Sequence, residues 1–185
     1  MGERNHRVKP GSPCRDGLTG LYNHGEFDQR LNETLARCRR YNRVFSMFML
    51  DIDHFCTVNE SFGRATGDRV LLGVADIIRT TTRGPDLVAR YEDDAFAVIL
   101  PETTRPHACI ATQRVLEVIG GHAFGVENRQ PLKITVSIGT ASFPDDADSQ
   151  EGLIVAADRA LSDAKRAGRN CVYSCDPTRR MEFDH

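Results

Sequence analysis

The feature that most constrains the fold is a nearly continuous apolar run, VFSMFMLDI, at positions 44–52. A strand with one face in water alternates apolar and polar residues, so an unbroken run of this length predicts a strand that is covered on both faces. The run ends in acidic residues, Asp51 and Asp53. We therefore expect a central strand of an α/β domain, with carboxylates at the rim of a cleft.

The remaining periodicity predicts helices and short strands around this central strand. Apolar residues at three- and four-residue spacing predict helices at about 26–41, 106–118 and 150–167, and another that follows Gly67-Asp68 and stops near Thr80 to Thr82. Strands are expected at 87–91, 96–100, 133–142 and 171–173. The strands at 87–91 and 96–100 are close enough to form a hairpin.

The length of 185 residues suits about one domain. Residues 1–15 mix charge, Gly, Pro and Ser without a period, so we expect a linker or tail from a longer protein, a domain over 16–176 and a C-terminal tail over 177–185. The six cysteines form no CxxC pair, which favours reduced thiols without a metal-binding role.

Charge and hydropathy exclude two classes of partner. A net charge of −2 and a pI near 6.3 give no basic field for binding a nucleic acid polymer. No apolar run approaches the ~20 residues that a membrane helix needs, and the N-terminus has no signal-peptide pattern. We expect a cytoplasmic domain that does not insert into a membrane.

Two carboxylates are candidates for binding a hard cation. Asp51 lies at a predicted strand end and Asp94 at the tip of the predicted hairpin. Adjacent strands would bring these oxygen ligands together, and Mg²⁺ prefers such ligands while leaving positions for phosphate. The alternative is that the acids only end a strand and form a solvated turn.

Several segments, in order and at fitting separations over about 16–172, resemble the GGDEF family of bacterial diguanylate cyclases. They are DGLTGLYNHGEFDQRL, LDIDHF, ATGDRVLLGVA, DLVARYEDDAF, TVSIGTASFP and ADRALSDAKRAGRN. The resemblance implies a sheet of about five mostly antiparallel strands flanked by helices, similar to the palm of nucleotidyl cyclases and polymerases. It also implies a catalyst that joins two GTP molecules into cyclic di-GMP only as a dimer.

The resemblance assigns roles position by position. Asp51, the carbonyl of Ile52 and Asp94 match metal-binding positions, and the two aspartates would be catalytic in an active member. Asn59 and Asp68 match positions that hydrogen-bond guanine, while Lys165 and Arg169 match phosphate-contacting positions. These residue types suit a base edge and a triphosphate. The alternatives are a helix N-terminal acid at Asp68 and a solvated basic helix end at Lys165 and Arg169.

The signature itself departs from the family. Where the family has two glycines, two acids and Phe, this chain has Glu92, Asp93, Asp94, Ala95 and Phe96. Cys56 stands at a position where the family usually has a phosphate-binding lysine, and Arg64 replaces a usual histidine.

These departures favour lost or impaired cyclase activity. Glycine permits φ > 0 in a tight hairpin, which Asp tolerates poorly and Glu worse. At about 5 Å and an effective dielectric of about 20, each added acid would repel a phosphate charge by roughly 3 kcal/mol. We therefore expect weakened GTP binding.

A second site is predicted at Arg83-Gly84-Pro85-Asp86, an RxxD pattern placed five residues before the signature. By the resemblance this is the family's product-binding inhibitory site, and Arg114 matches a further arginine of it. Arg can bond the O6/N7 edge of guanine and Asp can accept from its N1 and N2 side. The alternative is a weak surface ion pair in a helix-to-strand turn.

The leading functional hypothesis is a domain that senses cyclic di-GMP without making it, working with sensor or output domains of a longer protein. One alternative is an active, dimeric diguanylate cyclase that uses Mg²⁺ and GTP. Others are a GTP-binding regulatory domain, and a dimerisation or interaction domain that has lost both sites.

Overall fold

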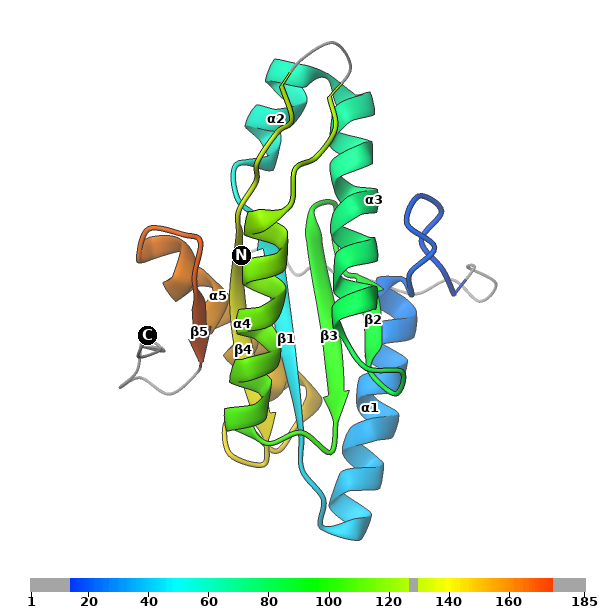
Figure 1. The fold of residues 1–185 in the computed structure, drawn as a ribbon. Coiled ribbons are helices and arrows are strands. Elements are labelled where there is room, and N and C mark those ends of the chain that lie inside the picture. The colour runs from blue at the N-terminus through cyan, green and yellow to red at the C-terminus, as the bar shows by residue number, and fades with distance from the viewer. Residues whose placement is uncertain (1–13, 127–129, 175–185) are drawn as a thin grey trace, which may run out of the picture.

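The apolar run forms β1 (Phe45–Ile52), the central strand of a five-stranded sheet in the order β2-β3-β1-β4-β5 (Figure 1). The other strands are β2 (Leu87–Arg90), β3 (Ala95–Pro101), β4 (Val136–Phe143) and β5 (Val172–Ser174). All neighbouring strands are antiparallel except β4 and β5, which are parallel. The expected α/β fold with a mostly antiparallel sheet is confirmed.

The chain is described here by a computed structural model, which covers residues 14–126 and 130–174. The expectations for most of the N-terminal segment, for the 177–185 tail and for Cys175 fall outside these residues.

Helices cover both faces of the sheet (Figure 1). On one face, Met47 and Met49 of β1 pack with α1 (His24–Tyr41) and α5 (Gln150–Arg166). On the other, Phe48 and Leu50 pack with α3 (Arg64–Thr81) and α4 (Arg105–Gly121). Successive side chains of a strand point to opposite faces, so an apolar run buries both sets. The two-sided burial expected for the central strand is thus confirmed.

Side chains cap two of the helices where the sequence provides suitable polar residues. Asn23 Oδ1 accepts a hydrogen bond from the Glu26 amide at the start of α1, at 3.0 Å, and Ser149 Oγ accepts from the Gly152 amide at the start of α5, at 3.1 Å. Such caps satisfy backbone donors that the first helical turn leaves free. None of the described helices combines the length and apolar character needed to cross a bilayer.

The segment between β1 and β2 differs from the sequence expectation. A short helix, α2 (Phe55–Phe62), follows β1, and α3 begins at Arg64 rather than after Gly67-Asp68. Gly63, with φ of 81°, allows the chain to turn between the two helices. The sequence reasoning missed α2 because the helix is only two turns long and its buried residues are only Phe55 and Val58.

One close contact between a helix and the sheet is at Gly139 in the middle of β4. A Cβ atom at this position would lie 2.2 Å from the Ala157 carbonyl oxygen and 2.2 Å from the Leu161 amide nitrogen of α5. The absence of a side chain therefore sets how closely α5 approaches the sheet, and α5 carries Lys165.

Candidate functional site

The structure brings Asp51, Ile52 and Asp94 to the same end of two neighbouring strands. Asp51 pairs with Ala95 of β3, and the Ile52 amide donates to the Asp94 carbonyl oxygen at 3.3 Å. Asp94 is the last residue before β3 begins. The antiparallel pairing of β1 and β3 is what places these residues together, as the sequence predicted.

Asp51 is a partly buried carboxylate in a charged environment. Burial raises the pKa of Asp51, the ion pair with Lys165 opposes this, and repulsion from Asp94 and Asp53 adds to the rise. Lys165 Nζ lies 2.8 Å from Asp51 Oδ2. Because burial and the neighbouring acids disfavour the charged form of Asp51, a cation beside its carboxylate would stabilise that form.

The arrangement fits a magnesium ion held together with phosphate. Two carboxylates and one carbonyl are available, and no cluster of three or more His, Cys, Asp or Glu suited to a metal occurs within 14–126 and 130–174. Magnesium commonly takes one or two protein carboxylates and completes its shell with water and substrate phosphates. These residues therefore suit a magnesium ion that completes its shell with water and phosphate.

Asp53 does not lie at the rim of a cleft with Asp51, as the sequence had suggested. Its side chain is buried, with Oδ2 accepting from Thr135 Oγ1 at 2.7 Å and from the Asn170 amide at 3.1 Å. Oδ1 accepts from Ser137 Oγ at 2.7 Å. Asp53 thus ties the end of β1 to the start of β4 and to the loop after α5, instead of lining an open rim.

The signature hairpin closes without the backbone conformation that we expected it to need. Neither Glu92 nor Asp93 has a positive φ. The amides of Tyr91 and Glu92 both donate to the Ala95 carbonyl oxygen, at 2.8 and 3.2 Å. Acidic side chains are therefore accommodated in this hairpin, and the expectation of dihedral strain was wrong.

Both added acids are exposed to solvent, which weakens the repulsion estimated from the sequence. Glu92 nevertheless lines a pocket of about 380 Å³ together with Asp51, Lys165 and Asp158. A phosphate entering this pocket would meet a charge that a glycine would not carry. Ala95 begins β3 and brings no carboxylate.

The base of the hairpin is fixed by aromatic packing. The Tyr91 ring stacks on His24 at 4.0 Å between centroids and meets Phe27 edge-on at 5.4 Å. Burial, with repulsion from Asp28, Glu92 and Asp158, raises the pKa of Tyr91 to about 12. The hairpin is thereby anchored to the first turns of α1.

The two guanine-binding candidates lie on adjoining helices, Asn59 on α2 and Asp68 on α3. The Asn59 amide lies directly over Gly67, where a Cβ atom would come within 1.9 Å of Asn59 Oδ1. Asp68 is exposed and lies in the second turn of α3 rather than at its N-terminus. Cys56, also exposed, is in the first turn of α2.

The two phosphate-binding candidates are separated by the end of α5. Lys165 lies in the last turn and reaches Asp51, whereas Arg169 follows the helix and is exposed. Arg169 and Asn170 both adopt positive φ, 66° and 49°. The hydrogen bond from the Asn170 amide to Asp53 holds this unusual pair of residues, a contact that local sequence patterns do not reveal.

The RxxD turn is closed by its own aspartate. Asp86 Oδ2 accepts from the Arg83 amide at 2.7 Å, and the Asp86 amide donates to the Arg83 carbonyl oxygen at 3.0 Å. Burial raises the pKa of Asp86, opposed by the hydrogen bond and charge of Arg83. The Arg83 side chain is exposed, as is that of Arg114 on α4.

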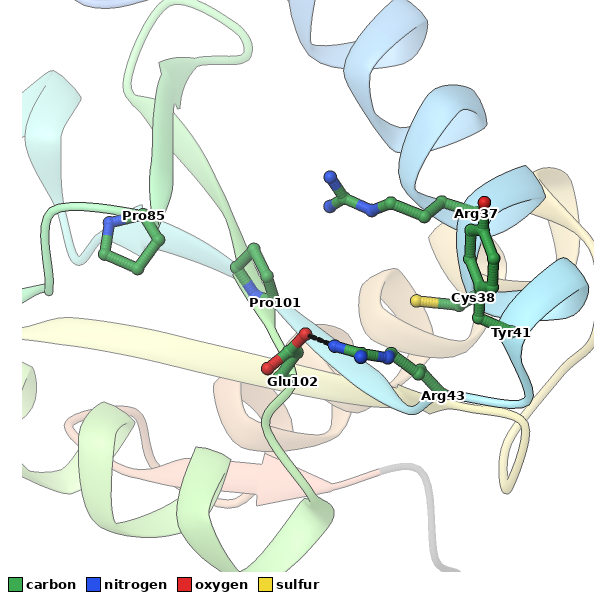
Figure 2. Close-up of a pocket in the computed structure, with 7 residues that line it drawn as sticks. All are labelled: Arg37, Cys38, Tyr41, Arg43, Pro85, Pro101 and Glu102. Atoms are coloured by element: carbon green, nitrogen blue, oxygen red, sulfur yellow. Dashed lines mark hydrogen bonds and ion pairs between the residues drawn. The ribbon is translucent and has the colours of Figure 1, made fainter.

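A cavity of about 610 Å³ lies beside this turn and was not expected from the sequence. Figure 2 shows Arg37 extending from α1 toward Pro85 and Pro101, with Arg43 paired to Glu102 at one side. Arg37 belongs to α1, far from the RxxD turn in the sequence. Its proximity to Pro85, the third residue of the RxxD turn, needed the structure.

Comparison with known protein families identifies the family to which this α/β domain belongs. The family model for the diguanylate cyclase GGDEF domain matches residues 14–171. The chain therefore belongs to the GGDEF family.

Individual relatives agree with the family. The chain is 34% identical over 156 residues to "Probable diguanylate cyclase DgcC" of Escherichia coli (strain K12), and over 158 residues to response regulator PleD of Caulobacter vibrioides (strain NA1000 / CB15N). These matches cover 84% and 85% of this chain but only 42% and 35% of the relatives. The GGDEF domain of DgcB from Caulobacter crescentus, solved in complex with c-di-GMP, has a TM-score of 0.85 at 30% identity, covering 94% of this chain and 99% of that one.

Proposed function

We propose that this GGDEF domain is a regulatory module of cyclic di-GMP signalling that binds cyclic di-GMP at the RxxD turn, with cyclase activity lost or impaired. The observation that carries the proposal is the preformed turn. The internal bond between Asp86 and the Arg83 amide fixes the backbone and leaves the Arg83 side chain exposed. A turn ordered before binding loses less entropy when a ligand arrives.

The turn offers guanine both kinds of partner. The Arg83 guanidinium can donate to the O6 and N7 atoms, and Asp86 Oδ1, which accepts no hydrogen bond from the described residues, can accept from N1 and N2. Arg37 in the adjoining cavity adds positive charge for phosphates, and Arg114 on α4 matches a further arginine position of the family's site. The DgcB domain, solved with c-di-GMP, supports the same ligand for this chain.

The signature loop supports impaired catalysis through charge rather than backbone strain. Glu92 adds an acid to the pocket that holds Asp51 and Lys165, while Ala95 supplies none. The metal-binding candidates Asp51 and Asp94 are retained. On this proposal the signature loop alters the electrostatic setting of a triphosphate while both acidic metal-binding candidates are kept.

Calorimetric titration of the domain with cyclic di-GMP tests the proposal. We expect saturable binding that Arg83→Ala abolishes, whereas Arg79→Ala, at an exposed arginine one turn earlier on α3, retains it. Binding that survives Arg83→Ala would place the ligand elsewhere. No binding at all would reject the sensor function.

A second candidate function, binding of magnesium and GTP as an effector, is favoured by the contact between Asn59 and Gly67. The small residue at 67 keeps the Asn59 amide at the junction of α2 and α3, where it can meet a base edge. Titration with GTP and Mg²⁺ in the wild type, Asn59→Ala and Asp94→Ala tests this. Binding lost in both variants would support an effector role and require a turnover assay at dimer-forming concentrations.

The proposal also covers the rest of the protein. Because this chain spans less than half of DgcC and PleD, we propose that sensor or output domains accompany it, and that the domain can pair with a second copy.

A further inference from the structure

The geometry points to Arg90 as a positioning residue that couples the N-terminal turn, Asp16–Tyr22, to the signature loop, Glu92–Asp94. One edge of its guanidinium holds the loop, because Nε and Nη2 donate to the Asp93 carbonyl oxygen at 3.2 and 2.6 Å. The other side holds the turn, because Nη1 donates to both carboxylate oxygens of Asp16, at 3.2 and 3.3 Å. Arg90 thus binds the signature loop through a backbone carbonyl oxygen and not through the acidic side chains of the loop.

The link is shielded from solvent. The side chains of Arg90 and Asp16 are only 16% and 22% exposed. A charged pair of this kind is worth more than a surface pair, and a partner left alone at a partly buried site is costly. Breaking the link should therefore have a clear local effect.

The N-terminal turn is itself well ordered. Asp16 accepts from the amide and the hydroxyl of Thr19, at 2.8 and 2.7 Å. Tyr22 then joins the exposed edge of β2, since its amide donates to the Val88 carbonyl oxygen and the Arg90 amide donates to its carbonyl oxygen. The turn is attached to β2 at the same residue that reaches the signature loop.

The consequence reaches the metal-binding candidates. Asp93 precedes Asp94, whose carbonyl oxygen accepts from the Ile52 amide at the end of β1. If the N-terminal turn moved, Arg90 would move with it and would shift the Asp93 peptide. The neighbouring Asp94 carboxylate would then change its position as well. Arg90 would in this way let the segment that leads into the domain set the conformation of the nucleotide pocket.

Amide hydrogen exchange by NMR tests this role at the loop itself. Two amides report on the loop because one end of each hydrogen bond belongs to it: the Glu92 amide donates to the Ala95 carbonyl oxygen, and the Ile52 amide donates to that of Asp94. We expect Arg90→Lys and Asp16→Asn each to accelerate exchange at both amides at least tenfold, with Phe48 in the core unchanged. The double variant should exchange no faster than the faster single variant, because both substitutions break one link.

Two comparisons keep the result decisive. Arg79→Lys alters an exposed Arg–Asp pair on α3 and should leave the loop amides unchanged. Thr19→Val removes one donor to Asp16 but keeps the ion pair, so it should fold even if Arg90→Lys does not, and give a smaller acceleration. Unchanged loop exchange, or equal acceleration at Phe48, would overturn the inference. Cyclic di-GMP is not used, so a failure of the proposed function would leave this result standing.

Discussion

Two turns flank the same four-residue strand, β2, and they are held in opposite ways. The RxxD turn before β2 is closed by a residue three positions away, Asp86 bonding to Arg83. The signature hairpin after β2 is held by Arg90, whose partner Asp16 lies 74 positions away in the sequence. A self-contained turn keeps its shape when distant residues change, whereas the hairpin depends on another part of the chain.

The aspartates of the two regions also titrate in opposite directions. Burial alone would raise the pKa of Asp16, but hydrogen bonds from Thr19 and Arg90 outweigh it and lower the pKa. Burial raises the pKa of Asp86, and its bond to Arg83 does not offset this. On acidification Asp86 should therefore take up its proton first, whereas the hairpin region loses the stabilising charge of Asp16 only at a lower pH.

The largest expected effect is at the RxxD turn. Asp86→Ala removes the turn closure and the acceptor for guanine, and bonds to a charged acceptor are worth about 1.5 kcal/mol each or more. The loss of two such bonds corresponds to about a hundredfold weaker cyclic di-GMP binding by calorimetry. Asp76→Ala, at an exposed aspartate of α3, is the control. If Asp86→Ala bound cyclic di-GMP within threefold of the wild-type affinity, the RxxD turn would not depend on closure by its own aspartate, and the contrast with the hairpin would fail.

The next largest effect concerns the binding of Mg²⁺ and GTP beside the signature hairpin. Replacing both Glu92 and Asp93 by Gly removes two exposed charges, each worth up to about 1 kcal/mol. We expect affinity for Mg²⁺ and GTP to rise by about thirtyfold, with cyclic di-GMP affinity unchanged. Unaltered GTP affinity would show that the acids do not limit nucleotide binding.

A smaller effect concerns the stability of the hairpin region. Because the pKa of Asp16 is lowered in the folded state, its ionised form stabilises the fold above its unfolded pKa, and this contribution is lost as the pH falls through the folded pKa. Asp16→Asn should therefore lower the free energy of unfolding by about 1 kcal/mol at pH 7 in urea titrations. A difference from the wild type that persists undiminished in strong acid would contradict this.

The smallest expected effect is the pH dependence of ligand binding. A raised pKa means that Asp86 takes up a proton at a higher pH than an ordinary aspartate, whose pKa is about 3.9. The neutral carboxyl accepts hydrogen bonds less well, so cyclic di-GMP affinity should fall a few-fold on mild acidification. Titrations of Asp86→Asn at the same pH values should show no such decline from this residue.

The sequence predicted the parts of the molecule that follow from local pattern. The apolar run gave the central strand, and the acids at two strand ends were correctly expected to meet because antiparallel neighbours share an edge. It could not reveal Arg90, since nothing near that residue points to Asp16. Nor could it show that Asp53 is buried or that Asn170 is bonded to it, because these contacts join segments more than 80 residues apart.

The hairpin shows a different limit of sequence reasoning. Glycine in a family signature suggested a conformation that acids resist, yet Glu92 and Asp93 occupy the turn with negative φ. The composition of a turn does not fix its dihedral angles when hydrogen bonds from neighbouring residues, here to Ala95, can close it another way.

The close contact at Gly139 affects the ion pair between Asp51 and Lys165. Because only a hydrogen atom fits between β4 and the backbone of α5, a methyl group at position 139 must push the helix outward. Lys165, near the far end of that helix, would then be drawn back from Asp51 although neither charged residue had been altered. The missing side chain in the middle of the sheet thus helps to set the distance between the Lys165 ammonium group and the Asp51 carboxylate.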